Sequence, residues 1–251
     1  MRMIGFTLFA LIYRRNYPAF WNGMGAMAEQ IEDPGIVPRG IVEGLLSLTW
    51  TATLLLAIAG TQALPTHQAA LAIPAQAAIL ALVTAVLMTV GKPMSNGQVN
   101  PVLTAAYAFD RRLPSSWIYS IAQIAGAIIA IQLFERLLGN PVMAAWVTSS
   151  LTYERYAGEW LGAAAFIMVL LWTRRSVPAK AALLAGAVLG IAYWASNGAV
   201  LINPAFTFAI AYATMETNPV IIDALPSILL AQFGGAIMGL FVGRFIWRRG
   251  S

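Results

Sequence analysis

Cysteine is absent from the sequence, and histidine occurs once, as His67, among 251 residues. Without cysteine the chain can form no disulfide bond and perform no thiol chemistry. A single histidine cannot form a histidine metal site or a relay of histidines. The sequence also lacks the pattern of a nucleophile with its base and that of a phosphate-binding loop. We therefore expect no bound metal, no cofactor and no enzymatic activity.

Charged residues are scarce as well. They make up 10% of the chain, whereas soluble domains usually contain about 25%. Hydrophobic residues make up 59%, and the mean hydropathy is +0.73. So few charges cannot provide the polar surface that a soluble protein of this length needs. The composition predicts an integral membrane protein.

Six apolar segments are long enough to cross a bilayer, which takes about 20 helical residues. An even number of spans places both ends of the chain on the same side. We therefore expect an all-α, multi-pass membrane protein. The predicted spans are residues 40–60, 72–91, 115–138, 157–174, 179–196 and 222–246.

The basic residues are divided unevenly between the two sides of the predicted membrane. Thirteen of the fifteen lie in segments on the side of the N-terminus, and only Arg136 and Arg155 lie on the other. Basic residues favour the cytoplasmic side, so we expect both termini to be cytoplasmic. The sequence leaves the membrane itself open, including an endomembrane or an organelle membrane.

The net charge of +5 does not indicate a nucleic-acid partner. The basic residues occur singly or in pairs at the ends of predicted spans, and they form no stripe on one face. We expect this chain to lie in a lipid bilayer and to bind no nucleic acid.

Two further apolar segments, residues 101–109 and 204–213, are too short to span. Each begins at the proline of an Asn-Pro pair and would rise about 14 Å, roughly half of the hydrocarbon core. The first follows the second predicted span and the other follows the fifth, so the two enter from opposite sides. Two such half-helices would meet near the middle of the membrane.

Asn100 and Asn203 can cap these half-helices. An N-cap asparagine accepts a hydrogen bond from the first turn, and the proline that follows, Pro101 or Pro204, has no N–H to satisfy. Each asparagine keeps an amide NH₂ group that can donate, beside the positive end of a helix dipole. Such a site would orient water or another small polar solute by its oxygen and would repel cations. Irregular backbone at this depth implies a cavity.

The sequence also repeats itself. Ser-Asn-Gly precedes both Asn-Pro pairs, and Ala-Gln-Ile-Ala-Gly-Ala at 122–127 returns as Ala-Gln-Phe-Gly-Gly-Ala at 231–236. We expect an internal repeat that relates residues 40–138 to residues 157–247. Each half has three spans, so the second half is inverted in the membrane.

Two carboxylates lie within predicted spans. Glu43, near the start of the first span, returns as Glu159 near the start of the fourth. An intramembrane carboxylate is a candidate for a proton path. The equivalent places of the two residues in the two repeats favour a structural role instead.

These features together carry a family resemblance. The residues concerned are Glu43, Ser95, Gly97, Asn100, Pro101, Thr104, Gln123, Glu159, Asn203, Pro204, Ala205, Phe208, Gln232 and Ala236. Through them the chain resembles the aquaporin, or major intrinsic protein, family. The resemblance implies an aquaporin-like bundle of six transmembrane helices plus two re-entrant half-helices, usually a homotetramer with one pore per subunit. It also implies passage of water or small uncharged solutes, and loops held by the two carboxylates through backbone N–H groups.

Some positions depart from the family's pattern. The family has Asn-Pro-Ala twice, but the first motif here ends in Val102 and only the second, ending in Ala205, is intact. Phe206 stands directly after the second motif, where the family usually has arginine. With these departures and its basic net charge, the chain resembles the small basic intrinsic proteins of plants and the divergent aquaporins of algae and protists.

By the family's spacing, the other constriction positions fall on Leu80, Ile191 and Val200, so the resemblance implies a wholly apolar constriction. The residue two before the first motif, commonly histidine in the family, is Gln98, which can still donate and accept. Two alternatives follow. The pore passes water at a reduced rate or a neutral solute of lower polarity, or the apolar residues hold it dry and shut.

Residues 1–39 precede the predicted channel domain, residues 40–251. Their apolar stretch is too short to span, which predicts an N-terminal arm at the membrane interface. We expect the chain to be a passive channel for water or a small neutral solute. The arm and the apolar constriction motivate an alternative, a non-conducting subunit of aquaporin fold with a structural role in a larger membrane complex.

Overall fold

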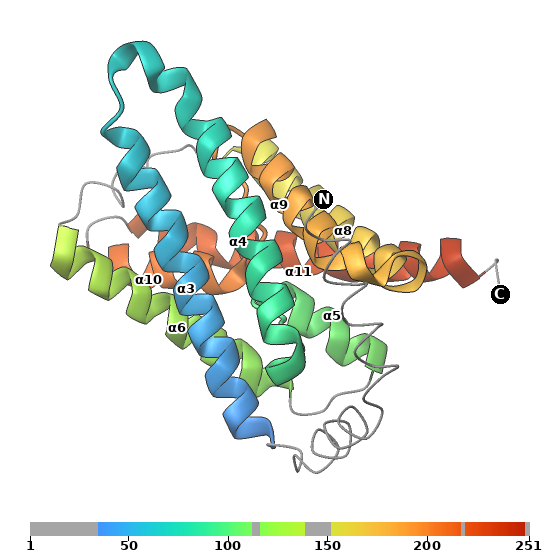
Figure 1. Ribbon diagram of the computed structural model, residues 1–251. Coiled ribbons are helices and arrows are strands. Elements are labelled where there is room, and N and C mark those ends of the chain that lie inside the picture. The colour runs from blue at the N-terminus through green and yellow to red at the C-terminus, as the bar shows by residue number, and fades with distance from the viewer. Residues whose placement is uncertain (1–34, 112–115, 139–151, 217–218, 249–251) are drawn as a thin grey trace, which may run out of the picture. The chain divides into compact units, whose positions relative to one another are not determined.

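The computed structural model describes residues 35–111, 116–138, 152–216 and 219–248. Within these ranges the chain forms helices and their connections, and no strand (Figure 1). The helices are α3 (Ile36–Gln62), η1 (Thr66–Leu71), α4 (Ala72–Ser95), α5 (Pro101–Arg111), α6 (Ser116–Leu138), α8 (Tyr153–Ser176), η2 (Pro178–Lys180), α9 (Ala181–Ala195), α10 (Pro204–Thr214) and α11 (Pro219–Arg248).

Among the described residues, six helices are long and apolar enough to cross a membrane, namely α3, α4 with η1, α6, α8, α9 with η2, and α11. They coincide with the six predicted spans and agree with the predicted class, an all-α membrane protein. Helix α3 begins at Ile36, so residues 36–39 belong to the first span and not to the arm. The rest of the predicted arm, residues 1–34, lies outside the described part of the chain.

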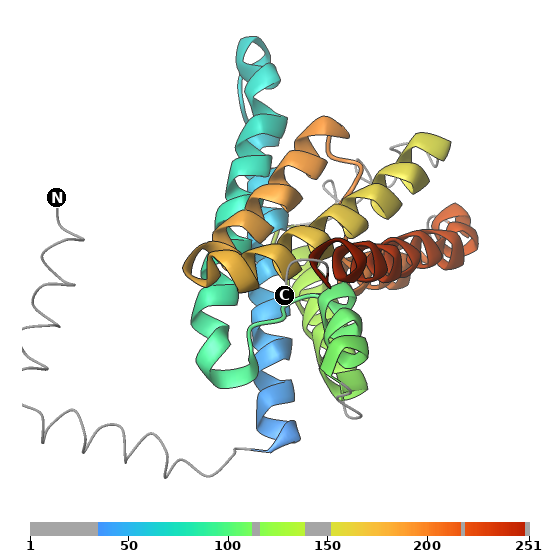
Figure 2. The ribbon, with the colours of Figure 1, turned by 90° about the vertical axis from the view of Figure 1, so that its right-hand side faces the viewer.

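The long helices pack in close pairs, α3 on α6, α8 on α11 and α4 on α9 (Figures 1 and 2). Small residues permit this approach. A Cβ atom at Gly126 in α6 would overlap with the carbonyl oxygen of Gly44 in α3, and one at Gly235 in α11 would overlap with that of Trp160 in α8. The same contact therefore occurs in both halves of the chain.

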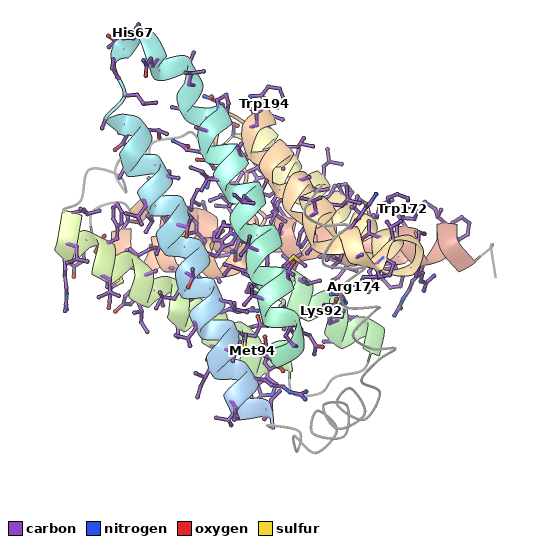
Figure 3. The ribbon with its side chains drawn as sticks, in the orientation of Figure 1. His67, Lys92, Met94, Trp172, Arg174 and Trp194 are labelled. Carbon is purple, nitrogen blue, oxygen red and sulfur yellow. The ribbon has the colours of Figure 1, made fainter. Side chains whose placement is uncertain are left out.

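Large apolar side chains cover the outward faces of these helices. Such a surface is unusual for a soluble protein and suits a helix bundle surrounded by lipid. Figure 3 shows Trp172 and Trp194 projecting outward from α8 and α9, and tryptophan is enriched at membrane–water interfaces. Exposed apolar residues include Leu56, Leu82, Leu183, Leu230, Phe241 and Phe245.

The two short helices lie inside the bundle. Each has 11 residues, about 16 Å of helix. Helix α5 contacts α6 and α11, α10 contacts the same two long helices, and α5 and α10 also contact each other. Their first turns are buried. The two Asn-Pro pairs are thus brought together in the interior although about a hundred residues separate them.

Candidate functional site

Both short helices begin as their Asn-Pro pairs predict. The Oδ1 atom of Asn100 accepts a hydrogen bond from the backbone N–H of Val102 at 2.9 Å. The Oδ1 atom of Asn203 accepts one from the N–H of Ala205 at 3.1 Å. With proline as the first residue of each helix, the donors of the first turn are largely satisfied without water.

The helix starts meet at a point that we call the junction, residues 100–102 and 203–205. Asn100 donates through Nδ2 to the carbonyl oxygen of Ile202, at 2.7 Å. Asn100 and Asn203 are only 4% and 1% exposed. The Nδ2 group of Asn203 makes no hydrogen bond to any residue that the structure describes. One amide therefore links the two loops, and the other still has donors available.

Ser-Asn-Gly brings left-handed backbone into the chain before each short helix. Asn96 and Gly97 have φ angles of +74° and +58°, and Asn197 and Gly198 have φ angles of +52° and +85°. Asparagine and glycine tolerate this left-handed conformation better than other residues. A Cβ atom at Gly97 would also overlap with the carbonyl oxygen of Met88. The repeated tripeptide thus turns the chain from a long helix back toward the junction.

The residues directly before the two asparagines are strained. Val99 and Ile202 have φ angles of +62° and +53°, which β-branched residues rarely adopt. Such a conformation costs about 1–3 kcal/mol and persists only where the surroundings hold it. In both loops a buried carboxylate provides the restraint.

Glu43 in α3 holds the first loop. Its Oε1 atom accepts from the N–H of Gln98 at 2.8 Å, and its Oε2 atom accepts from the N–H of Val99 at 2.7 Å. The Oγ of Ser95 donates to Oε1 at 2.6 Å, and Nε2 of Gln123 donates to Oε2 at 2.8 Å. Four donors thus compensate for the burial of one carboxylate.

Glu159 in α8 holds the second loop in the same way. It accepts from the N–H groups of Leu201 at 3.2 Å and Ile202 at 2.8 Å. Nε2 of Gln232 donates to it at 3.0 Å and also to Oγ1 of Thr207 in α10, again at 3.0 Å. Each glutamate therefore orients one loop. Neither carboxylate contacts the side-chain amides of Asn100 and Asn203 directly.

Three of the four predicted constriction residues are buried. Leu80, Val200 and Phe206 are each at most 1% exposed. The Phe206 ring meets Trp50 of α3 edge to face, with ring centroids 6.0 Å apart and an interplanar angle of 72°. Nε1 of Trp50 donates to Oγ1 of Thr84 at 2.9 Å, which fixes the indole. A fixed aromatic side chain from α3 thus packs against the residue that follows the second motif.

The prediction was wrong for Ile191, which is 61% exposed and points away from this group. Gly190 faces α4, where a Cβ atom would lie 2.7 Å from the carbonyl oxygen of Ala77. This packing turns Ile191 outward and Tyr193 inward. The Tyr193 hydroxyl donates to Gln76 of α4, whose Nε2 donates to Oγ1 of Thr61 at 2.6 Å.

Sequence reasoning missed Trp50 and Tyr193. Trp50 follows Glu43 by seven residues, or two helical turns, and Phe166 follows Glu159 by the same interval. Both aromatic side chains are buried. This shared spacing was the available signal for Trp50, because residues seven apart lie on one face of a helix. Nothing comparable marks Tyr193.

A cavity of about 580 Å³ opens on the other side of the junction, toward the end of α8. Gln98, two residues before Asn100, lines this cavity, and its buried Oε1 atom accepts no hydrogen bond from the residues that the structure describes. Arg174 at the cavity wall lies over the Tyr107 ring, 4.2 Å from the ring centroid. The remaining lining residues are Met88, Thr89, Lys92, Asn96, Gly97, Leu170, Pro178, Ala179, Ala181 and Ala182.

Comparison of the chain with protein-family models and with curated proteins gives no match. The functional interpretation therefore depends on the residues of the junction and on their geometry.

Proposed function

We propose that this protein is a passive transmembrane channel for water, other small uncharged solutes, or both, with an aquaporin-like architecture. One observation carries the proposal. Two short helices inside a bundle of membrane-length helices begin at buried Asn-Pro pairs, and the Asn100 amide bonds to the loop that ends at Asn203. Non-helical backbone inside a membrane protein is tolerated where protein buries it or where it lines a water-filled cavity, and helix starts of this kind often face a polar solute or an ion.

The chemistry of the junction suits a neutral solute that carries an oxygen atom. The Asn203 amide can donate to such an oxygen, and the positive ends of α5 and α10 favour the same orientation. A cation would meet these ends without compensating carboxylates, because Glu43 and Glu159 are occupied by backbone donors. The expected cargo is therefore uncharged.

The paired contacts support an inverted repeat, residues 40–138 and 157–247. Glu43 and Glu159 hold equivalent loops, Gln123 and Gln232 donate to them, and the glutamines also reach hydroxyls in α5 and α10. In this architecture α5 and α10 are re-entrant half-helices that approach the membrane centre from opposite sides. A homotetramer is the assembly that the aquaporin resemblance implies.

The two ends of the proposed path differ in polarity. On one side the 580 Å³ cavity leads to Gln98 and is lined by several polar side chains. On the other side the path meets Leu80, Val200 and Phe206, which are closed to solvent. Conduction therefore requires the Phe206 ring to move away from Trp50.

The burial of Leu80, Val200 and Phe206 also favours a second candidate function. If Phe206 does not move, the chain is a non-conducting subunit of aquaporin fold that stabilises a larger membrane complex. The buried edge-to-face contact of Phe206 with Trp50 is the observation in its favour.

Stopped-flow light scattering on proteoliposomes distinguishes the two functions. We expect water permeability above that of empty liposomes, together with permeability to glycerol or urea. The variant Asn203→Asp keeps a good N-cap but loses the amide donors and adds a negative charge, so it should lose most of this permeability. Asn197→Asp, the same change at an exposed loop position, is the matched control. Permeability equal to that of empty liposomes for all three solutes would reject the channel and favour the non-conducting subunit.

A further inference from the structure

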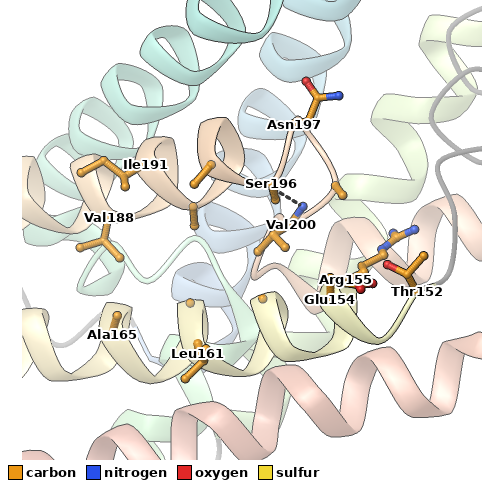
Figure 4. A pocket seen from close by; sticks show the side chains of 15 residues that line it. Thr152, Glu154, Arg155, Leu161, Ala165, Val188, Ile191, Ser196, Asn197 and Val200 are labelled. Carbon is orange, nitrogen blue, oxygen red and sulfur yellow. Dashed lines mark hydrogen bonds between the residues drawn. The ribbon is translucent and has the colours of Figure 1, made fainter.

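Two cavities in the described part of the chain differ in how their polar side chains are engaged. The larger, of about 970 Å³, lies between α8 and α9 (Figure 4). Among its lining residues, the Ser196 hydroxyl donates to the carbonyl oxygen of Tyr193 at 3.1 Å, and the Thr152 hydroxyl donates to Glu154. Donors that are already bonded within the protein are not available to a ligand. These hydroxyls therefore select no occupant for the groove.

The cavity of about 580 Å³ beside the first loop has cationic groups that are available. Lys92 in the last turn of α4 and Arg174 in the last turn of α8 line it from two helices, and Figure 3 labels both. Neither side chain donates a hydrogen bond to, or forms an ion pair with, any residue that the structure describes. Arg174 lies over the face of the Tyr107 ring, and this contact leaves the N–H groups at the edge of the guanidinium free. Both groups can therefore bind an anion.

No carboxylate opposes this attraction from the described wall of the cavity, because none of the described lining residues is acidic. Glu43, which accepts from the backbone N–H of Gln98, does not line the cavity, and four hydrogen bonds compensate its charge. Arg174 is partly buried, so water screens its charge less than that of an exposed arginine. We expect the electrostatic potential in the cavity to be positive.

Gln98 places an unsatisfied acceptor in the same cavity. The residue is 1% exposed, and its Oε1 atom accepts no hydrogen bond from the described residues. The Thr89 hydroxyl, which also lines the cavity, donates instead to the carbonyl oxygen of Ala85 at 2.7 Å. A buried acceptor without a donor is unfavourable. A ligand with an O–H group would supply the missing donor.

We propose that this cavity binds an oxyanion that carries an O–H group, for which hydrogen phosphate is the simplest case. The charged oxygens accept from Arg174 and Lys92, and the O–H group donates to Oε1 of Gln98. The cavity volume lies within the range of about 300–1,000 Å³ that small-molecule sites occupy. Sulfate is also tetrahedral, but it has no proton at neutral pH and leaves Gln98 unsatisfied. Binding does not depend on conduction, so it stands or falls separately from the channel function.

Equilibrium dialysis of the full chain in an uncharged detergent with labelled phosphate tests the proposal. We expect one retained phosphate per chain. Sulfate should displace it only at a concentration about tenfold higher than that of unlabelled phosphate, because sulfate cannot donate to Gln98. Displacement by both anions at equal concentrations would overturn the role of Gln98, and the absence of retained phosphate would overturn the site.

Substitutions test the three groups separately. Arg174→Gln removes the partly buried charge and should weaken phosphate retention by about tenfold, and Lys92→Gln should weaken it by about threefold, because Lys92 is exposed. Gln98→Leu removes the acceptor and should make phosphate and sulfate equal competitors. Arg175→Gln is the matched control and should retain phosphate as the unaltered chain does, because Arg175 is exposed and does not line the cavity.

Equal losses for Arg174→Gln and Arg175→Gln would mean that surface charge attracts phosphate without a site in the cavity, and the proposal would be wrong. The comparison of phosphate with sulfate uses the unaltered chain, so it remains decisive if a variant does not fold.

Discussion

In the proposed channel, Phe206 is the residue that we expect to limit conduction. It lies in the first turn of α10, three residues after Asn203, and its ring is wholly buried against Trp50. The ring has no polar atom, so it offers nothing to replace the hydrogen bonds that a passing water molecule gives up. The Phe206 ring thus makes this part of the proposed path narrower and less polar.

We predict that Phe206→Ala raises the water permeability of proteoliposomes. Truncation removes the ring that packs on Trp50 and leaves a gap beside the Asn203 amide. The variant should also lose about 3–5 kcal/mol of unfolding free energy, as large buried aromatic side chains do on truncation. Stopped-flow scattering measures the first effect, and thermal unfolding in detergent measures the second.

Phe208→Ala provides the control, since Phe208 is on the same helix and 39% exposed. It should leave permeability unchanged and cost less stability. Equal permeability of the Phe206→Ala variant and the unaltered chain would show that residue 206 does not limit conduction.

We predict that Glu43→Gln and Glu159→Gln destabilise the chain by about 2 kcal/mol or more. An amide cannot accept at both of its ends, so one loop N–H loses its partner in a buried place. Glu43 accepts four hydrogen bonds and Glu159 accepts three, so both variants should lose stability. Thermal unfolding in detergent measures both variants.

The exposed Glu154 offers the matched control, and Glu154→Gln should unfold within a degree or two of the unaltered chain. If all three variants unfold alike, the carboxylates do not stabilise the loops.

At the scale of helices, close backbone contact decides which elements pair. Gly126 in α6 and Gly235 in α11 each lie where a side chain would overlap with the backbone of the neighbouring long helix. Because these contacts recur in both halves, the same geometry brings Gln123 and Gln232 to the two carboxylates. Helix packing thereby positions the loops that lead to the junction.

We predict that Gly126→Ala lowers the unfolding free energy, although alanine favours helix by about 1 kcal/mol over glycine. The added methyl group must push α3 and α6 apart. Gly60→Ala is the control, because Gly60 lies in α3 with no atom near the position of an added Cβ. Calorimetry should show a lower unfolding temperature for the first variant and an unchanged or higher one for the second. A rise for both would mean that the α3–α6 contact tolerates a wider spacing.

For the whole molecule, the natural absence of cysteine makes the predicted orientation testable. The distribution of basic residues predicts that η1 lies on the outer side and the connection at η2 on the inner side. His67, at the exposed η1 turn that Figure 3 labels, and Ala179, in η2, are exposed. Single cysteines at these two positions report on opposite faces of the membrane.

We predict that His67→Cys reacts with an impermeant maleimide added to sealed cells, whereas Ala179→Cys reacts only after the membrane is opened. The cysteine-free chain is the blank. The reverse pattern would invert the orientation of the protein, and labelling of both variants in sealed cells would contradict the three spans, α4, α6 and α8, that separate the two positions.

Much of the architecture follows from local properties of the sequence. The scarcity of charge, the lengths of the apolar segments and the capping chemistry of Asn100 and Asn203 depend on neighbours along the chain, and the helices begin and end close to where these signals place them. The repeated Ser-Asn-Gly likewise permits the left-handed backbone found at both places, because Asn and Gly tolerate it better than other residues.

The surroundings of Phe206 were decided only by the tertiary structure. The direction of each side chain on α9 depends on how Gly190 packs against α4, and this packing turns Ile191 outward and Tyr193 inward. Trp50 reaches Phe206 from a helix more than 150 residues away in the chain. Helical periodicity tells which residues share a face, but the choice of the face that meets the junction is a property of packing between distant segments.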